Sequence, residues 1–240
     1  MKTVRKNFEI KASDASFDAE TGLLIGAASV TGVMDEADDV IFPGVYTPIL
    51  AQFLTEGFVA LSHDWAALPV AMPQLIEERG RQLYTEAVFH STQAAQDVRT
   101  VCAERLAAGK SIGLSVGFMT DASDYVYFES GANLLQFARA NGYNMALFDT
   151  AGISAFDDWC CGIIGVERLI EYSVTPIPCN RQALISGVKG ADGSIVRAKD
   201  RRTIEGETAQ SHKTVTIARQ LSHRTLTARL VAAKGAGGFK

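Results

Sequence analysis

Ser111-Ile112-Gly113-Leu114-Ser115-Val116-Gly117-Phe118 is the stretch of sequence that decides the fold. Small and apolar residues alternate along it, which predicts a buried strand over residues 112–120. Leu114, Val116 and Phe118 share one face, which can be anchored in a core. Ser115 lies on the other face between two glycines, which leaves room for a substrate backbone to approach its hydroxyl. The letters match the GxSxG elbow, but no helix clearly follows, and a Gly-rich strand that merely crosses another strand fits equally well.

The sequence around this stretch predicts strands and helices in mixed order. Alternating residues predict two strands within 7–34 and further strands over 58–63, 68–76, 83–89 and 168–176. Helical spacing predicts helices over 43–57, 93–108 and 133–140. The inward stripe expected for the second of these helices is Ala94, Val98, Val101, Cys102 and Leu106. Because no regular βαβ order is visible, we expect an α+β fold built on an antiparallel β-barrel surrounded by helices.

Length and composition exclude several classes of protein. The 240 residues are 47% hydrophobic and 21% charged, as in a globular protein, so a wholly disordered chain is excluded. No apolar run reaches the roughly 18 residues that a membrane helix needs, and no secretory signal is predicted. The four cysteines lack CxxC spacing, and Cys160-Cys161 has no second pair at zinc-site spacing. The acidic run 35–39 does not match an EF-hand loop, so neither a metal nor a cofactor is expected.

Charge divides the chain into an acidic body and a basic tail. Residues 190–240 hold ten Lys and Arg against four Asp and Glu, a net charge of +6, whereas residues 1–189 carry -10. We therefore expect a domain over 1–189 and a flexible basic C-terminal tail over 190–240. Such a tail favours self-association or docking on an acidic partner. The body lacks a nucleic-acid-binding motif, so nucleic acid is not the expected partner.

His63 and Glu171 are the ionisable residues whose positions suggest chemistry. His63 follows the apolar strand Phe58–Leu61, and a histidine at a strand end can serve as a general base near neutral pH. Glu171 interrupts the apolar strand around 169–174, where a carboxylate is costly unless it is paired. A histidine is a suitable partner, as in a catalytic triad. A structural histidine and an edge-strand glutamate facing water are the alternatives.

These pieces together resemble a known family. The residues that carry the resemblance are Asp39-Val40-Ile41-Phe42-Pro43-Gly44, Leu61-Ser62-His63, Gly113–Phe118 and Leu169–Pro176. In this combination they resemble the prohead maturation proteases of tailed bacteriophages, serine proteases related to the herpesvirus capsid assembly protease, assemblin. The resemblance spans about residues 20–186. It implies an assemblin-like fold, with Ser115 as nucleophile, His63 as base and Glu171 as the third member of the triad.

The resemblance also implies a place and a set of partners. It indicates a serine endopeptidase that works inside the viral prohead in the host cytoplasm. Its expected substrates are the major capsid protein with its scaffolding region and the protease itself, as a homo-oligomer without membrane association. Backbone amides, Arg168 or Arg181 are the candidates for the oxyanion hole. A non-catalytic capsid-assembly component with the same fold is the alternative.

Two stretches depart from the family pattern. Residues 121–165 form an insertion between the serine strand and the glutamate strand. We expect the insertion to lie outside the barrel and to bury its apolar residues against the barrel rim or a second subunit, as a substrate lid or an oligomer contact. The loop that follows the glutamate strand, residues 176–180, also differs from the usual P-A-N-P.

Overall fold

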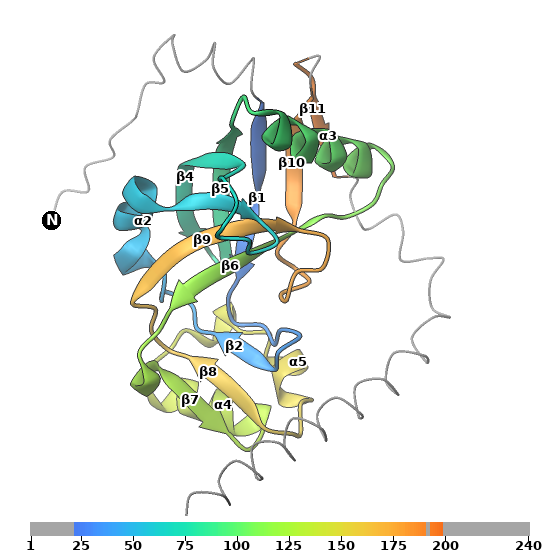
Figure 1. Ribbon diagram of the computed structural model, residues 1–240. Coiled ribbons are helices and arrows are strands. Elements are labelled where there is room, and N and C mark those ends of the chain that lie inside the picture. Colours follow the sequence, from blue (N-terminus) through green and yellow to red (C-terminus); the bar gives the residue numbers. More distant parts are fainter. Residues whose placement is uncertain (1–21, 191–192, 199–240) are drawn as a thin grey trace, which may run out of the picture. The chain divides into compact units, whose positions relative to one another are not determined.

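The computed structural model describes residues 22–190 and 193–198. These residues form an α+β fold with one eight-stranded and one three-stranded sheet (Figure 1). Of the sequence-based expectations, the strand before residue 22 and most of the basic tail lie outside the described residues. Within the described ranges, no helix is long and apolar enough to cross a membrane.

The eight-stranded sheet contains the Ser115 strand as its edge strand β6. Its strands, in spatial order, are β11 (Ile195–Arg197), β10 (Ile185–Lys189), β1 (Leu23–Val30), β5 (Gln82–Phe89), β4 (Ala71–Arg79), β3 (Phe58–Leu61), β9 (Arg168–Thr175) and β6 (Gly113–Met119). All neighbours are antiparallel except β3 and β9, which are parallel. The sheet is thus antiparallel as expected except at β3 and β9, the pair that carries the site.

The sheet curls so that its β6 edge returns to the start of β10. The Leu114 amide donates to the Ala183 carbonyl at 2.9 Å, and the Ile185 amide donates to the Ile112 carbonyl at 3.1 Å. At this crossing Leu114 approaches Gly26 of β1 so closely that a Cβ at Gly26 would lie 3.0 Å from Leu114 Cδ1. The expected barrel is thus present as a curled sheet whose first and last parts meet along one short segment.

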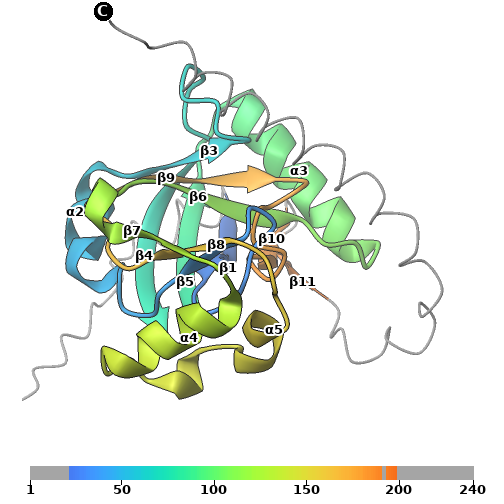
Figure 2. The same ribbon diagram turned by 90° about the horizontal axis from the view of Figure 1, so that it is seen from below.

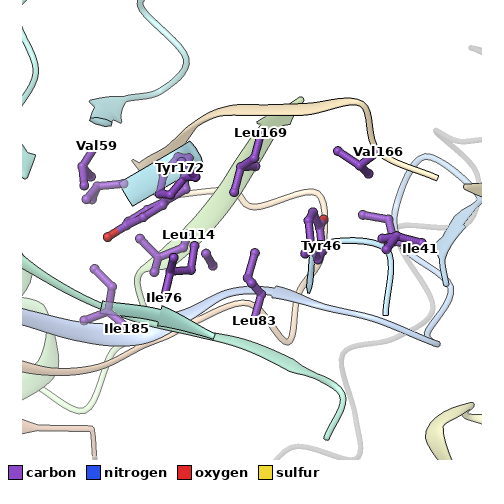
Figure 3. Packing of buried hydrophobic residues seen from close by; sticks show 14 of the residues in the cluster. Ile41, Tyr46, Val59, Ile76, Leu83, Leu114, Val166, Leu169, Tyr172 and Ile185 are labelled. Atoms are coloured by element: carbon purple, nitrogen blue, oxygen red, sulfur yellow. The ribbon is translucent and has the colours of Figure 1, made fainter. Parts of the chain in front are cut away.

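The core fills the concave side of the curled sheet. Leu114 and Tyr172 are fully buried there beside Ile76, Leu83 and Ile185 (Figure 3). The Tyr172 hydroxyl accepts a hydrogen bond from Thr85 Oγ1 at 2.8 Å, which satisfies its buried oxygen. Because side chains alternate along a strand, the burial of Leu114 and Tyr172 directs Ser115 and Glu171 to the other face.

Two helices cover this sheet. The turn η1 (Thr47–Ile49) leads into α2 (Leu50–Glu56), whose Phe53 ring lies 5.9 Å from the Tyr172 ring. The longer helix α3 (Gln93–Ala107) lies beside β10 and β11 in Figure 1. Its buried residues are Ala95, Arg99, Cys102 and Leu106, so Cys102 and Leu106 of the expected stripe are confirmed, whereas Ala94 and Val101 are exposed. The hydrophobic pattern did not predict that Arg99 lies in the interior, where its guanidinium is buried and hydrogen-bonded to the Lys189 carbonyl.

The insertion forms most of a second, smaller sheet. In it β8 (Cys160–Ile163) pairs in parallel with β2 (Asp39–Ile41) and antiparallel with β7 (Tyr125–Phe128). The helix α4 (Gly131–Ala140) packs on β7 and β8, and α5 (Thr150–Ser154) packs beside α4, as Figure 2 shows from below. The short turns η2 (Ala122–Asp124) and η3 (Met145–Leu147) complete the insertion.

Phe42 anchors the insertion to the body. Its ring makes edge contacts with Phe137, Tyr143 and Phe148, at centroid distances of 6.2, 4.8 and 5.2 Å. Most of the insertion's apolar side chains are therefore buried within the same chain, although Trp159 remains 60% exposed. The resemblance motif at residues 39–44 thus has a structural role, because it supplies both a strand and a packing centre.

The ordered sheet extends past the expected end of the body at residue 189. The short strand β11 pairs with β10 through Val196 opposite Val188, and Val196 packs against the core. The remaining expectations for the basic tail fall outside the described residues.

Candidate active site

The central position of β9 brings the site residues together. On one side β9 pairs with β6, so Ser115 lies opposite Ser173 and Gly117 lies opposite Glu171. On the other side β9 pairs with β3, with Ala60 opposite Ser173. Residues opposite one another in a ladder direct their side chains to the same face. Ser115, Ser173 and Glu171 therefore share the face away from the core.

His63 reaches this face through a tight turn at the end of β3. The Asp64 amide donates to the Leu61 carbonyl at 3.0 Å, which closes a four-residue turn. Both central residues have positive φ, 51° at Ser62 and 59° at His63, as in a type I′ turn. This turn folds the chain back over β9 and places the imidazole beside Glu171.

Glu171 is fully buried and hydrogen-bonded through both carboxylate oxygens. His63 Nδ1 lies 2.7 Å from Oε1, and Ser173 Oγ donates to Oε2 at 2.8 Å. The backbone amide of His63 in turn donates to Ser173 Oγ at 2.8 Å. The alternative of an edge-strand glutamate facing water is therefore excluded, because β9 is an interior strand and the carboxylate has no exposure.

The turn is strained, and its hydrogen bonds offset the strain. A non-glycine residue held at positive φ costs about 1–3 kcal/mol, and Ser62 and His63 are two in succession. Each hydrogen bond to a charged group contributes about 1.5–3 kcal/mol. The two bonds to Glu171 are thus large enough to hold His63 in a conformation that the isolated turn would not favour.

The two glycines of the serine strand serve packing rather than substrate entry. A Cβ at Gly113 would overlap the ring of Pro178, and a Cβ at Gly117 would overlap the Glu171 carboxylate and lie 3.3 Å from Trp65 Cζ2. The expectation that these glycines leave room for a substrate backbone is therefore wrong. The protein's own loop fills the space at Gly113, and the acid partner of His63 fills it at Gly117.

Ser115 is partly exposed on the same face, two residues along β6 from Gly117, the residue opposite Glu171. Within the described residues its hydroxyl makes no hydrogen bond, so a bond to His63 stays a prediction. Of the two arginines considered for an oxyanion hole, Arg168 Nη2 binds Glu56 at 3.1 Å. Arg181 Nε binds Glu36 at 2.7 Å. Both guanidinium groups are thus engaged by glutamates.

The acidic stretch 35–39 is a turn that leads into β2 and forms a hydrogen-bonded junction. Asp35 Oδ1 accepts from the amides of Ala37 and Asp39, and Asp39 Oδ1 accepts from the Tyr125 hydroxyl at 2.9 Å. Burial raises the pKa of Asp39 from 3.8 to about 6. Cys179 Sγ lies 3.3 Å from Asp35 Oδ2, so this junction links the second sheet to the loop after β9. Within the described ranges no group of His, Cys, Asp and Glu side chains is arranged to hold a metal ion.

An open hollow of about 520 Å³ lies elsewhere, between the 43–48 segment and the start of the insertion. Asp121, Asp124 and Glu167 border it, beside apolar residues that include Val45 and Ile164. Its lining includes neither His63 nor Ser115 nor Glu171. The hydrogen-bonded residues of β9 are therefore separate from this hollow.

The comparisons with known proteins give one relative. The chain is 25% identical over 198 residues to a protein named prohead protease from Enterobacteria phage HK97, which covers 80% of this chain and 72% of that protein. No protein-family model matches the chain. No solved structure matches it either.

Proposed function

We propose that this chain is a prohead protease that works as a serine endopeptidase through Ser115, His63 and Glu171. The similarity to the phage protein of that name supports a protease role in capsid maturation. The observation that carries the serine mechanism is the 2.7 Å hydrogen bond between His63 Nδ1 and the buried Glu171, on the face that also presents Ser115. A carboxylate that orients a histidine beside a serine is the arrangement that activates the hydroxyl.

In the proposed reaction, His63 Nε2 takes the proton of Ser115 as Oγ bonds to the scissile carbonyl carbon. The imidazolium so formed is stabilised by Glu171, and it then gives its proton to the leaving amine as the C–N bond breaks. Water attacks the resulting acyl-enzyme with the same histidine as base, which releases the acid product and restores Ser115. Main-chain amides are the expected donors to the oxyanion, since Arg168 and Arg181 already bind glutamates.

Labelling with an alkyl fluorophosphonate tests the nucleophile directly. We expect the wild-type protein to be labelled at Ser115, identified by peptide mass spectrometry, and Ser115→Ala to remain unlabelled. His63→Ala should be labelled far more slowly because the base is lost. Ser186→Ala is the matched control, since Ser186 is an exposed serine of β10 whose hydroxyl donates to the Ile25 carbonyl. Absence of labelling in the folded wild type would instead favour the non-catalytic capsid-assembly component.

We further propose that the substrates are the major capsid protein with its scaffolding region, and the protease chain itself. Co-expression with the capsid protein of the same virus, followed by mass spectrometry of the new termini, tests this proposal. Cleavage should occur with the wild type and should be absent with Ser115→Ala. Equal cleavage in both would assign the cuts to a host protease.

A further inference from the structure

Three hydrogen bonds form a closed circuit around Ser173. The His63 amide donates to Ser173 Oγ, Ser173 Oγ donates to Glu171 Oε2, and Glu171 Oε1 meets His63 Nδ1, at 2.8, 2.8 and 2.7 Å. The circuit therefore starts at the backbone of His63 and returns to its own imidazole. We propose that Ser173 is a positioning residue of the active site, an inference that rests on the proposed protease function.

The donor and acceptor roles in the circuit are constrained. A backbone amide can only donate, so Ser173 Oγ accepts from His63 and its own proton is available for Glu171. An ionised carboxylate can only accept, so the proton between Glu171 and His63 belongs to Nδ1. This assignment leaves the lone pair of the neutral imidazole on Nε2, the nitrogen that a general base must present to Ser115. Ser173 thus helps to select the reactive tautomer.

The surroundings of Ser173 make this role specific. The side chain is fully buried, so water does not compete for its hydrogen bonds. On β9 it lies between Ala60 of β3 and Ser115 of β6, the strands that carry the base and the nucleophile. Without its hydroxyl, the buried Glu171 Oε2 loses its donor and the strained His63 amide loses its acceptor. Either loss frees the imidazole to move relative to Ser115.

The test compares Ser173→Ala with the hydroxyl-preserving Ser173→Thr and with Ser29→Ala as a control. Ser29 is also a buried serine of the eight-stranded sheet, but its partner is the Tyr46 hydroxyl. The probe is an alkyl fluorophosphonate, and its concentration dependence separates the maximal labelling rate, kinact, from the half-saturating concentration, KI. A second readout is the low-field ¹H NMR signal of the His63 Nδ1 proton, which does not depend on activity.

We expect Ser173→Ala to lower kinact by about 10–100-fold, because small displacements of a catalytic group cost rates of that order. KI should stay within about twofold of wild type, since the substitution does not alter probe binding. The low-field signal should broaden or disappear in Ser173→Ala and persist in Ser173→Thr and Ser29→Ala. Ser173→Thr should recover most of the wild-type kinact.

A folded Ser173→Ala protein with wild-type kinact and an unchanged low-field signal would overturn the proposal. If Ser173→Ala does not fold, Ser173→Cys decides instead, because a thiol is a weak donor of similar size. An unchanged kinact and signal in Ser173→Cys would overturn the proposal, and an intermediate loss would support it. If Ser115→Ala is labelled like the wild type, the protease function fails, while the NMR signal still shows whether Ser173 positions His63.

Discussion

Glu171 occupies the space that a side chain at Gly117 would need. The two residues lie opposite each other on β9 and β6, and a Cβ atom at Gly117 would overlap Glu171 Oε1, the oxygen that binds His63. Trp65 closes over the same glycine from the turn that carries His63. The glycine therefore allows the carboxylate to lie flat against the serine strand, within reach of the imidazole.

Gly117→Ala should consequently reduce both activity and stability. The new methyl group must displace the carboxylate or the indole, and a misplaced orienting group lowers the rate by at least about tenfold. Overpacking of this kind costs about 1–3 kcal/mol of unfolding free energy. Fluorophosphonate labelling and urea unfolding measure the two effects. Gly187→Ala is the matched control, because its Cβ would meet Ile195 Cγ2 at an ordinary 3.5 Å.

Glu171→Gln should lower the maximal labelling rate by about 10³–10⁴-fold while the protein stays folded. The amide can donate to His63 Nδ1, which would place the imidazole proton on Nε2 and remove the base. Titration of the rate against fluorophosphonate concentration checks the loss, and circular dichroism checks the fold. A rate within tenfold of wild type would mean that Glu171 does not set the tautomer.

The positive φ at Ser62 leads to a prediction about the unfolding free energy alone. Ser62→Gly should stabilise the protein by up to about 1 kcal/mol, because glycine adopts positive φ without the steric cost that serine bears. Ser62→Val should destabilise it by more than that, since a β-branched residue tolerates this conformation poorly. Thermal unfolding of both variants against wild type is the measurement. If the two variants unfold at the same temperature, the strain does not exist in solution.

The raised pKa of Asp39 leads to a prediction about how stability depends on pH. Because burial raises its pKa to about 6, the folded protein binds this proton more tightly than the unfolded chain does. Burial of the charged Asp39 carboxylate lowers the free energy of unfolding. This loss is absent below about pH 4 and grows as the pH rises to about 6. Asp39→Asn, which can still accept from Tyr125, should therefore raise the unfolding temperature at neutral pH. The difference should vanish near pH 4, and an equal gain at both pH values would contradict the assignment.

The basic tail should be lost by self-cleavage. An exposed chain can enter a protease cleft at little cost, and residues 190–240 combine a charge of +6 with low hydrophobicity. Intact-mass measurements over time should show removal of a C-terminal segment in the wild type and none in Ser115→Ala. Because β11 belongs to the sheet, we expect the cut to fall after Arg197. Equal trimming of both proteins would indicate a contaminating protease.

The local patterns of the sequence predicted the central strands well. The alternation around Ser115 and the apolar run around Glu171 became β6 and β9 almost residue for residue, because both strands have one strongly apolar face. The helix predicted over 93–108 became α3, and Cys102 and Leu106 of its predicted stripe are buried, but the charged Arg99 also lies in the interior, which the pattern did not predict. A hydrophobic pattern cannot reveal a guanidinium whose burial is stabilised by a distant carbonyl.

Pairing between distant segments could not be predicted. The parallel contact between β2 and β8 joins two short strands, and neither is long enough to show alternation. For the same reason β10 and β11 were not predicted, and the predicted domain ended at residue 189, before β11. At the site, the sequence indicated His63 and Glu171 as possible partners. It did not indicate Ser173, because a serine on an apolar strand becomes informative only when its neighbours in space are known.

His63 is separated from Glu171 by 108 positions and from Ser173 by 110. During synthesis, a nascent chain that already includes β6 and the His63 turn still lacks Glu171 and Ser173, the two residues that hydrogen-bond to His63. The imidazole can be held only after β9 has left the ribosome and inserted between β3 and β6. Ribosome-bound fragments that end before residue 171 therefore lack both hydrogen-bond partners of His63, so under the proposed function the order of translation delays cleavage until the sheet is assembled.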